Sequence, residues 1–541
     1  MLIYQVHGLC RAENSLFAKF YLGIRCDFSK KYTILCGNLC FLQRFQQKIF
    51  DSLLKSTYNE GMSKELIIGR EHEIQQLTES CNSKESQLVI VYGRRRVGKS
   101  FLINQFFDNR FDFKLVGDNR LSKEEQLYNF YDELRRQWGK EIEVPKTWRE
   151  AFFLLRDYLE AVKTNKRNVV FFDEMPWLDN QKSGFLAAFE YFWNSFGASQ
   201  NNLMLIVCGS ATSWLVDNFE HNKGGLFNRQ NCRLYLEPFN LYETEKFLLE
   251  KKGINWSRYD ICECYMILGG IPYYLDLLSK NMSPEENIDN LFFKRRGALW
   301  DEFDNLYNTL FSNSENYIKV VEALFSKKYG MNKTELLAKT KLSDNFSFAA
   351  MLRNLSDSGF IRTYCFFGNK KKGTVYQIAD YFTMFYLKFV KDNYGSDEKF
   401  WTHHLDQPSR RAWAGLTFET LCKDHLEQIK KKLSIAGVSS EVSVWSRQAT
   451  EEQNGAQIDL LIDRRDRIID ICEMKFSENK FVIDKDYDEN LRNKISAFKE
   501  ATGTRKAVQL VLVTTYGVKQ NMYSSRVQGE VTMDDLFEKE K

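Results

Sequence analysis

The sequence lacks several features that mark specialised classes of protein. Its 541 residues include 6 prolines and 29 glycines, too few for a collagen-like or low-complexity chain. No uninterrupted run of about 18 apolar residues occurs, so no membrane-spanning helix is expected. The first residues also lack a basic segment followed by an apolar stretch, so no signal peptide is expected. We therefore expect a cytoplasmic globular protein without membrane contacts.

A strong excess of charge is also missing. The net charge is +4, and residues 1–61 contribute eight basic and four acidic side chains to it. The chain from Met62 onward is formally neutral, so any basic surface for nucleic acid must be local. Residues 1–61 show no clear periodicity, and we expect the functional protein to begin at Met62. The alternative is an N-terminal extension that packs on the core, and N-terminal sequencing of the native protein distinguishes the two.

The 12 cysteines follow no metal-binding pattern. Cys262 and Cys264 form a Cys-x-Cys pair, but no second Cys or His pair follows at the spacing of a zinc site. Others, such as Cys208 and Cys472, lie in apolar runs. We interpret them as small buried side chains in a reducing compartment.

From residue 85 onward, apolar runs alternate with amphipathic segments. This alternation is typical of a parallel sheet with helices on both faces, that is, an α/β fold. Residues 240–310 are predicted to be helical. Strands are predicted at 87–92, 111–116, 168–174, 202–210 and 232–239, and helices at 99–108, 121–138, 148–165 and 183–196.

The second half of the chain shows two other patterns. Residues 317–359 are predicted to form three helices, and 360–380 a hairpin around the basic turn GNKKKG. Three helices followed by a hairpin are typical of a winged helix-turn-helix. From residue 415 the predicted order is helix, three strands, helix and strand, which indicates a separate α/β domain.

Residues 93–100, GRRRVGKS, match the phosphate-binding pattern GxxxxGK[ST] between a predicted strand and a predicted helix. Glycines let backbone N–H groups approach phosphates, and a helix N-terminus favours anions. Lys99 is expected to reach the β- and γ-phosphates and Ser100 to bind Mg²⁺, so the expected cofactors are ATP and Mg²⁺. The alternative is an accidental glycine-rich turn. The residues expected to contact the nucleotide here are Gly93, Arg94, Arg95, Arg96, Val97, Gly98, Lys99, Ser100 and Phe101.

Two later strands end in polar residues. Asp173 and Glu174 follow an apolar strand, and we assign Asp173 to Mg²⁺ and Glu174 to the general base. The alternative is an acidic pair that faces solvent. Ser210, which ends the next strand, is expected to sense the γ-phosphate. Arg229 lies where a neighbouring copy could supply an arginine in a homo-oligomer, although an exposed arginine is more often a solvated charge.

The ordered segments GRE (69–71), GRRRVGKS, FFDEMPWL, CGSATSW, GLFNR and GGIPYYL resemble AAA+ P-loop ATPases of the signal-transducing, STAND-like branch. The resemblance implies that ATP lies between a sheet core and a helical lid. It also implies that Arg70 belongs to the nucleotide site and that Gly270 and Pro272 lie near the base. The chain has no obvious lid arginine, which favours slow, switch-like hydrolysis over a ring motor.

Residues 310–380 carry eleven basic and six acidic side chains. Lys370, Lys371 and Lys372 lie at the predicted wing tip, and Lys341 and Arg353 flank the third helix. Local basic density suits contacts with DNA phosphates. The alternative is that the winged helix is a protein–protein or intramolecular module.

The C-terminal region holds ordered carboxylates: Glu419 on a helix, Asp459 on a strand, and Glu473-x-Lys475 on the next strand. On a strand, positions two apart share a face, so Glu473 and Lys475 lie on the same side. Glu419, Asp459 and Glu473 are expected to bind Mg²⁺, and Lys475 to position or polarise water. The order resembles the PD-(D/E)XK nuclease fold, and the region is similar to a C-terminal domain of unknown function found behind such ATPases in bacteria and archaea. The alternative is that these are surface charges or the remnant of a lost site.

We therefore predict a P-loop ATPase core with a lid, a winged helix and a restriction-endonuclease-like domain. The predicted function is an ATP switch that hydrolyses ATP slowly, coupled to DNA binding and metal-dependent DNA cleavage. The alternative is an ATP-switched regulatory or partner-binding protein with an inactive nuclease-like domain. Convergence of the C-terminal carboxylates with Lys475 discriminates between these functions. The predicted boundaries are a leader at 1–61, the core at 62–239, the lid at 240–310, the winged helix and linker helix at 311–395, and the nuclease-like domain at 396–541.

Overall fold

The computed structural model describes residues 67–162, 166–180, 182–221, 224–368, 374–393, 395–447 and 455–540. The expectations for residues 1–61, for Met62 and for Lys370, Lys371 and Lys372 lie outside this part of the chain. None of the helices in the described part is long and apolar enough to cross a membrane.

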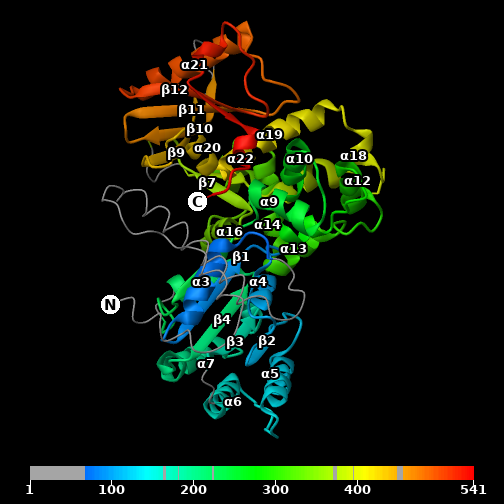
Figure 1. Cartoon of the computed structure of the whole chain (residues 1–541), viewed down its shortest axis with the longest axis vertical. Helices are drawn as coiled ribbons and strands as arrows, with labels where there is room; N and C mark the ends of the chain where they lie inside the picture. Colours follow the sequence, from blue (N-terminus) through cyan, green and yellow to red (C-terminus); the bar gives the residue numbers. More distant parts are fainter. Residues whose placement is uncertain are drawn as a thin grey trace, which may run out of the picture. The chain divides into compact units, whose positions relative to one another are not determined.

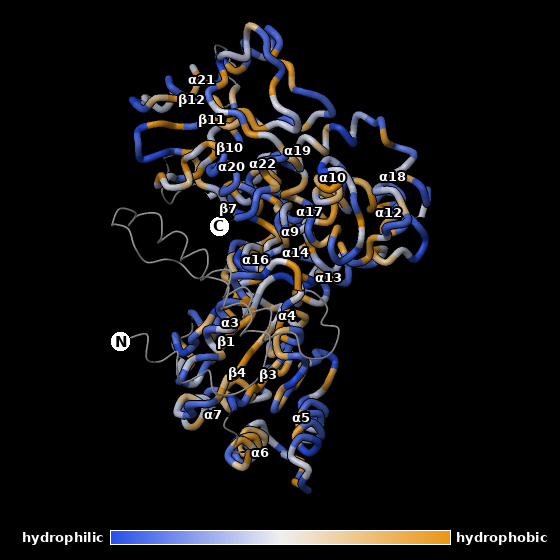
Figure 2. Tube along the Cα trace, viewed as in Figure 1, coloured by the Kyte–Doolittle hydropathy of each residue, from blue (hydrophilic) through white to orange (hydrophobic). Residues whose placement is uncertain are grey.

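The first described region contains a five-stranded parallel sheet with the order β2-β3-β4-β1-β5 (Figure 1). Its five predicted strands are confirmed, and only their ends differ. Figure 2 shows hydrophobic residues along β3 and β4, the strands between β2 and β1. The strands are β1 (Gln87–Gly93), β2 (Phe113–Val116), β3 (Asn168–Asp173), β4 (Leu203–Gly209) and β5 (Cys232–Leu236).

Helices cover both faces of this sheet, as the sequence predicts. Leu88 and Ile90 of β1 pack into a hydrophobic cluster with α5, α6 and α7. Val89 and Val91, which point the other way, pack with α3 and α4. The helices are α3 (Glu71–Asn82), α4 (Lys99–Phe106), α5 (Lys123–Trp138), α6 (Trp148–Ala161) and α7 (Phe185–Ser195), and the short α8 (Thr212–Val216) follows β4.

Residues 241–310 are largely helical, as predicted. They are followed by three helices and a small antiparallel sheet with the order β6-β8-β7. The first helices are α9 (Leu241–Lys246) with its extension η5 (Phe247–Lys251), α10 (Arg258–Leu268), α11 (Pro272–Asp276), α12 (Pro284–Ile288) with η6 (Asp289–Phe293), and α13 (Glu302–Leu310). The next elements are α14 (Ser314–Phe325), β6 (Met331–Asn332), α15 (Lys333–Thr340), α16 (Phe346–Asp357), β7 (Ile361–Tyr364) and β8 (Val375–Ile378).

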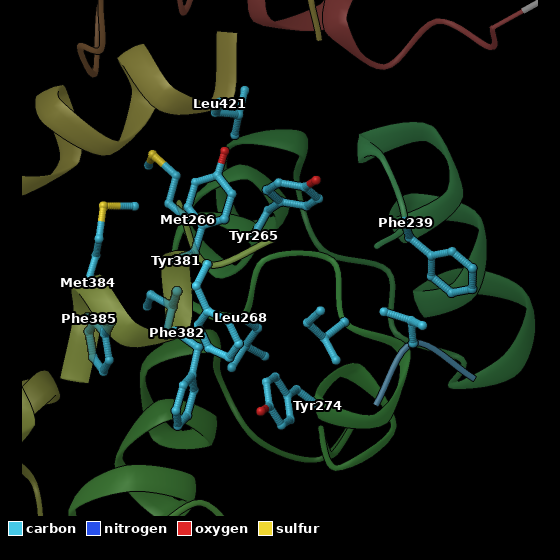
Figure 3. Close-up of a cluster of buried hydrophobic side chains, with 14 of the residues drawn as sticks. Phe239, Tyr265, Met266, Leu268, Tyr274, Tyr381, Phe382, Met384, Phe385 and Leu421 are labelled. Carbon is cyan, nitrogen blue, oxygen red and sulfur yellow. The ribbon is translucent and has the colours of Figure 1, made fainter. Parts of the chain in front are cut away.

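Helix α17 (Tyr381–Phe385), with its extension η7 (Tyr386–Val390), is buried among the lid helices. Figure 3 shows Tyr381 and Phe382 beside aromatic side chains of α10 and α11. The rings of Tyr381 and Tyr265 lie 5.5 Å apart, and those of Phe382 and Tyr274 lie 5.2 Å apart. Helix α17 therefore shares one hydrophobic core with α10 and α11, because aromatic side chains from all three pack together.

The C-terminal region forms a mixed sheet with the order β13-β12-β11-β10-β9. Strands β9, β10 and β11 pair antiparallel, whereas β11, β12 and β13 pair parallel. Helix α19 packs on β11 and α21 packs on β10. The short β13 and α22 are not predicted from the sequence. The elements are α18 (Phe400–His403), α19 (Pro408–Asp424), α20 (Leu426–Lys432), β9 (Ser440–Arg447), β10 (Ala456–Arg464), β11 (Ile468–Lys475), α21 (Lys485–Thr502), β12 (Ala507–Thr514), β13 (Gly529–Thr532) and α22 (Met533–Leu536).

Candidate functional site

The sheet topology brings the predicted phosphate loop and the acidic pair together. Strands β3, β4 and β1 are neighbours and run parallel, so their carboxyl ends meet at one edge. Gly93 ends β1 with a φ of 137°, and a Cβ there would lie 2.3 Å from the carbonyl oxygen of Leu236. Only glycine fits this turn. The chain then wraps from Arg94 to Gly98, and α4 begins at Lys99.

A cavity of about 420 Å³ lies at this edge. Its walls include the loop, the ends of β3 and β4, and residues of the lid. Apolar side chains that include Ile67, Phe239, Phe247 and Tyr273 form part of it. The predicted nucleotide residues that line the cavity are Arg70, Arg95, Arg96, Val97, Gly98, Lys99, Ser100, Phe101, Glu174, Ser210 and Pro272.

Polar contacts at the cavity floor form a connected set. The Ser100 hydroxyl donates to Asp173 Oδ1 at 2.8 Å, and Lys99 Nζ donates to the Gly93 carbonyl oxygen at 2.9 Å. Burial raises the pKa of the Asp173 carboxyl, and the hydrogen bond from Ser100 opposes that rise. Asp173 lies behind Ser100 rather than in the cavity wall.

Glu174 is held away from a regular strand conformation. Its φ of 48° lies in the left-handed region, which is strained for a residue with a side chain. Its carboxylate accepts hydrogen bonds from Ser210 N at 2.9 Å and from Ser210 Oγ at 2.5 Å. The strained backbone and the two hydrogen bonds fix Glu174 against Ser210. Lys99 Nζ lies 3.4 Å from the same Ser210 hydroxyl.

Two of the three loop arginines reach residues far along the chain. Arg94 forms a buried ion pair with Asp380, which caps α17. Burial lowers the pKa of Arg94, but Asp380, Tyr274 and Tyr307 together raise it by more, so the net shift is upward. Arg96 donates two hydrogen bonds of 3.0 Å to Glu302 on α13, and its guanidinium lies 4.0 Å from the ring centre of Tyr273. The loop is therefore tied to the lid and to α17.

Several predicted residues lie elsewhere than expected or have a second role, and Gly93 does not line the cavity. The Arg94 side chain does not line the cavity, because it pairs with Asp380 instead. Arg70 lines the cavity but also donates to the carbonyl oxygens of Glu237 at 2.7 Å and Val97 at 3.3 Å, which braces the loop. Arg229 is exposed and lies outside the cavity wall, and its role toward a neighbouring copy stays a prediction.

The role of Glu419, Asp459 and Glu473 toward Mg²⁺ stays a prediction, and these side chains have other partners in the structure. Within the described residues, no three His, Cys, Asp or Glu side chains are grouped to hold a metal ion. Glu473 instead accepts hydrogen bonds from Lys494 at 2.5 Å and Tyr487 at 3.2 Å, both on α21. Lys475 lies over the ring of Tyr487 at 5.2 Å.

Strand β10 contains a bulge close to Asp459. The register against β9 shifts between Ile458 and Leu461. Asp459 lines a small pocket with Lys423 and Tyr364. Glu419 pairs with Lys328 at 3.0 Å, while burial and Asp459 raise its pKa.

The basic side chains between residues 310 and 368 are largely matched by acids. Arg353 on α16 faces Asp217 beyond α8 at 3.4 Å, and Lys333 pairs with Asp344 at 2.5 Å. Helix α16 itself packs against α8. The described part of this region therefore places its third helix on the ATPase-like core.

The interpretation of the cysteines as buried side chains is confirmed for most of those described. Cys208, Cys262, Cys264, Cys422 and Cys472 are buried, but Cys365 is exposed. The eight described cysteines form no disulfide.

Sequence reasoning missed the partners of the loop arginines. Glu302 and Asp380 lie 206 and 286 positions from their partners, and no local pattern points to such pairs. It also missed Lys251, a lid cation in the cavity wall that lies 3.7 Å from Asp276. The helical periodicity of residues 240–310 could have indicated that this region presents polar side chains on one face, but not that Lys251 lines the cavity.

Comparisons with known proteins identify a family model, a relative and solved structures that this chain resembles. A family model described as an ATPase domain predominantly from Archaea matches residues 67–278. An uncharacterised protein of Methanocaldococcus jannaschii is 24% identical over 422 residues, which cover 77% of this chain and 88% of that protein. A solved Walker-type ATPase of Pyrococcus abyssi is 22% identical with a TM-score of 0.44, covering 61% of this chain and 99% of that one. The ORC2 protein of Aeropyrum pernix, solved in ADPNP–ADP complexes, is 14% identical with a TM-score of 0.42. The match covers 62% of this chain and 96% of that protein.

Proposed function

Residues 67–278 form an ATPase-type P-loop domain of a predominantly archaeal family, and from this premise we propose that the protein is an ATP-binding, slowly hydrolysing nucleotide switch. One observation carries the proposal. The loop that would hold the phosphates is also tied to Glu302 and Asp380 through Arg96 and Arg94. A change at the phosphates therefore acts directly on α13 and α17.

The residues of the cavity fit a nucleoside triphosphate with Mg²⁺. Lys99 exchanges its carbonyl contacts for phosphate oxygens, and the backbone of the loop with the start of α4 favours an anion. Ser100 and Asp173 are the residues that would hold Mg²⁺, whose remaining ligands are commonly phosphate oxygens and waters. When bound, Mg²⁺ neutralises charge on the phosphates. Apolar residues such as Phe239 and Pro272 suit contact with the base of the nucleotide.

Hydrolysis requires Glu174 to orient a water and take its proton. In the structure both carboxylate oxygens of Glu174 are engaged by Ser210. Ser210 must therefore release Glu174, at least in part, before the carboxylate can act as a base. This requirement supports slow, switch-like turnover, and the absence of an arginine among the cavity residues of the lid supports it as well.

ATP binding and turnover test the proposal directly. We expect Lys99→Ala to weaken ATP binding and to abolish hydrolysis. Glu174→Gln is expected to retain ATP binding and to lose hydrolysis by about 10²–10⁴-fold, the usual contribution of a general base. Binding is measured by calorimetry and turnover by phosphate release. Unchanged turnover in Glu174→Gln contradicts the assigned role.

For the C-terminal region we favour a regulatory or partner-binding role over DNA cleavage. The observation behind this choice is that Glu473 accepts hydrogen bonds from Lys494 and Tyr487, and that Glu419 pairs with Lys328. DNA cleavage is tested by incubating supercoiled plasmid with the protein, ATP and Mg²⁺ or Mn²⁺. We expect the plasmid to stay intact, and cutting that Lys475→Ala abolishes would reinstate the nuclease.

DNA binding through Lys370, Lys371 and Lys372 is a separate proposal, supported by the local excess of basic residues between 310 and 380. Replacing the three lysines by alanine is expected to weaken DNA binding and to flatten its dependence on salt. Equal affinity and an equal salt slope in the variant exclude these lysines as the contact. Association of copies through Arg229 is tested in the same preparations by sedimentation with and without ATP.

A further inference from the structure

We propose that Arg95 supplies, within the same chain, the cation that stabilises the γ-phosphate during hydrolysis. The inference rests on the proposed function and adds a catalytic residue to it. It also removes the need for an arginine from a second copy.

The first observation is the contrast among the three consecutive arginines. Arg94 and Arg96 form ion pairs with Asp380 and Glu302. Arg95 and Arg96 both line the cavity, whereas Arg94 does not. The guanidinium of Arg96 is bound to Glu302, while Arg95 lies in the cavity wall with Lys99, Ser100, Glu174 and Ser210 and keeps a buried donor without a partner in the described part of the chain.

The second observation is an unsatisfied donor. Nη1 of Arg95 is buried and has no hydrogen-bond partner among the described residues. Burial and the neighbouring Arg96 lower the pKa of Arg95, while Glu302 and Glu174 act in the opposite direction. A guanidinium remains protonated in proteins, so this donor keeps its charge. A buried donor without a partner is unfavourable, and a phosphate oxygen would satisfy it.

The position near Glu174 selects the γ-phosphate. Glu174 is the residue assigned to the attacking water, and it lines the same cavity as Arg95. In the reaction the water oxygen bonds to the γ-phosphorus, the bond to the bridging oxygen of the β-phosphate breaks, and the water proton passes to Glu174. The products are ADP and inorganic phosphate. Arg95 would neutralise the negative charge on the transferring group, a role that planar guanidinium groups perform well.

Arg229, the other candidate, has the opposite setting. It is exposed and is absent from the cavity wall. To reach a nucleotide it needs a second copy, whereas Arg95 already lines the site.

The experiment compares the full chain with Arg95→Ala, Arg95→Lys and the matched control Arg156→Ala, an exposed arginine that pairs with Asp157 on α6. We expect Arg95→Ala to lower the single-turnover rate by about 10³–10⁵-fold, as for other arginines of this kind, while ADP affinity stays close to that of the native protein. Arg95→Lys should recover only part of the rate, because lysine lacks the planar, forked set of donors of a guanidinium group. Circular dichroism checks that the variants fold.

A mixing experiment separates action within a chain from action between chains. Arg95→Ala is mixed with Lys99→Ala, which carries Arg95 but lacks the lysine assigned to the phosphates. We expect no recovery of turnover, and recovery would overturn the inference in favour of an arginine from a neighbour. If Arg95→Ala hydrolyses ATP at the native rate, the role of Arg95 is overturned while the proposed ATPase function still stands. A native protein that neither binds nor hydrolyses ATP overturns the proposed function as well.

Discussion

His425 illustrates how a single buried residue joins distant parts of this chain. It is fully buried, its Nε2 accepts from the backbone N–H of Leu241 at 2.9 Å, and its Nδ1 donates to the carbonyl oxygen of Leu421. Because Nε2 acts as an acceptor, the ring is neutral. Burial lowers the pKa of His425 below 6.5. The start of α9 is therefore linked to the end of α19 by a ring that must stay uncharged.

The lowered pKa of the buried His425 predicts that the stability of the protein depends on pH. The folded pKa lies below the unfolded value, so the unfolded chain binds a proton first as the pH falls below about 6.5. Stability is thus lost on acidification, by up to about 1.4 kcal/mol per pH unit for one proton. We expect His425→Gln, whose side-chain oxygen can still accept from Leu241, to lose less stability between pH 7 and pH 5. Urea midpoints measure this, and equal slopes in both proteins contradict the prediction.

Residues at the phosphate loop were predictable because motif and position coincide. Lys99, Ser100 and Asp173 follow directly from a pattern between an apolar strand and a helix. The left-handed backbone of Glu174 was not predictable, because nothing in FFDE indicates a positive φ. Neither was the inward direction of Arg95, since three identical side chains in a row carry no signal that separates them.

At the scale of elements, the connection between the phosphate loop and α17 depends on one buried ion pair. Arg94 and Asp380 are both buried, and Arg94 also lies 5.0 Å from the ring centre of Phe360. Asp380 in addition accepts from the backbone N–H of Thr383 at 3.1 Å, which caps α17. Removing one partner of such a pair leaves an uncompensated buried charge.

A double-mutant cycle tests this connection. We expect Arg94→Met and Asp380→Asn each to destabilise the protein by about 3–5 kcal/mol, the usual cost of breaking a buried pair. Asparagine can still cap α17, so the variant removes the charge but not the cap. Because the double variant leaves no uncompensated buried charge, its loss of stability should be clearly smaller than the sum of the two single losses. Denaturant midpoints of all four proteins give the coupling. Simple additivity would show that the pair does not join the two elements.

Elements with strong apolar runs were predicted well, and irregular ones were not. The five strands of the first sheet and most C-terminal elements follow from continuous or alternating apolar residues. The bulge between Ile458 and Leu461 has no such signal. The short β13 and α22 likewise form because β12 and α20 offer them a surface, which no local sequence pattern reveals.

At the scale of the molecule, residues far apart in sequence meet around the cavity. A single hydrophobic cluster includes Ile68 near the cavity, Leu268 and Phe382 in the region of Figure 3, and Phe537 near the C-terminus. Protein interiors are closely packed and transmit small displacements, so a change at the phosphate loop reaches α13 and α17 through Glu302 and Asp380. The central claim is that nucleotide state alters these helices.

Hydrogen exchange of backbone amides tests this claim most directly. Glu174→Gln, which should bind ATP without hydrolysing it, is compared with MgATP and with MgADP. We predict that exchange differs between the two states in the phosphate loop and also in α13 and α17. A difference confined to residues 67–278, or no difference at all, would contradict the account.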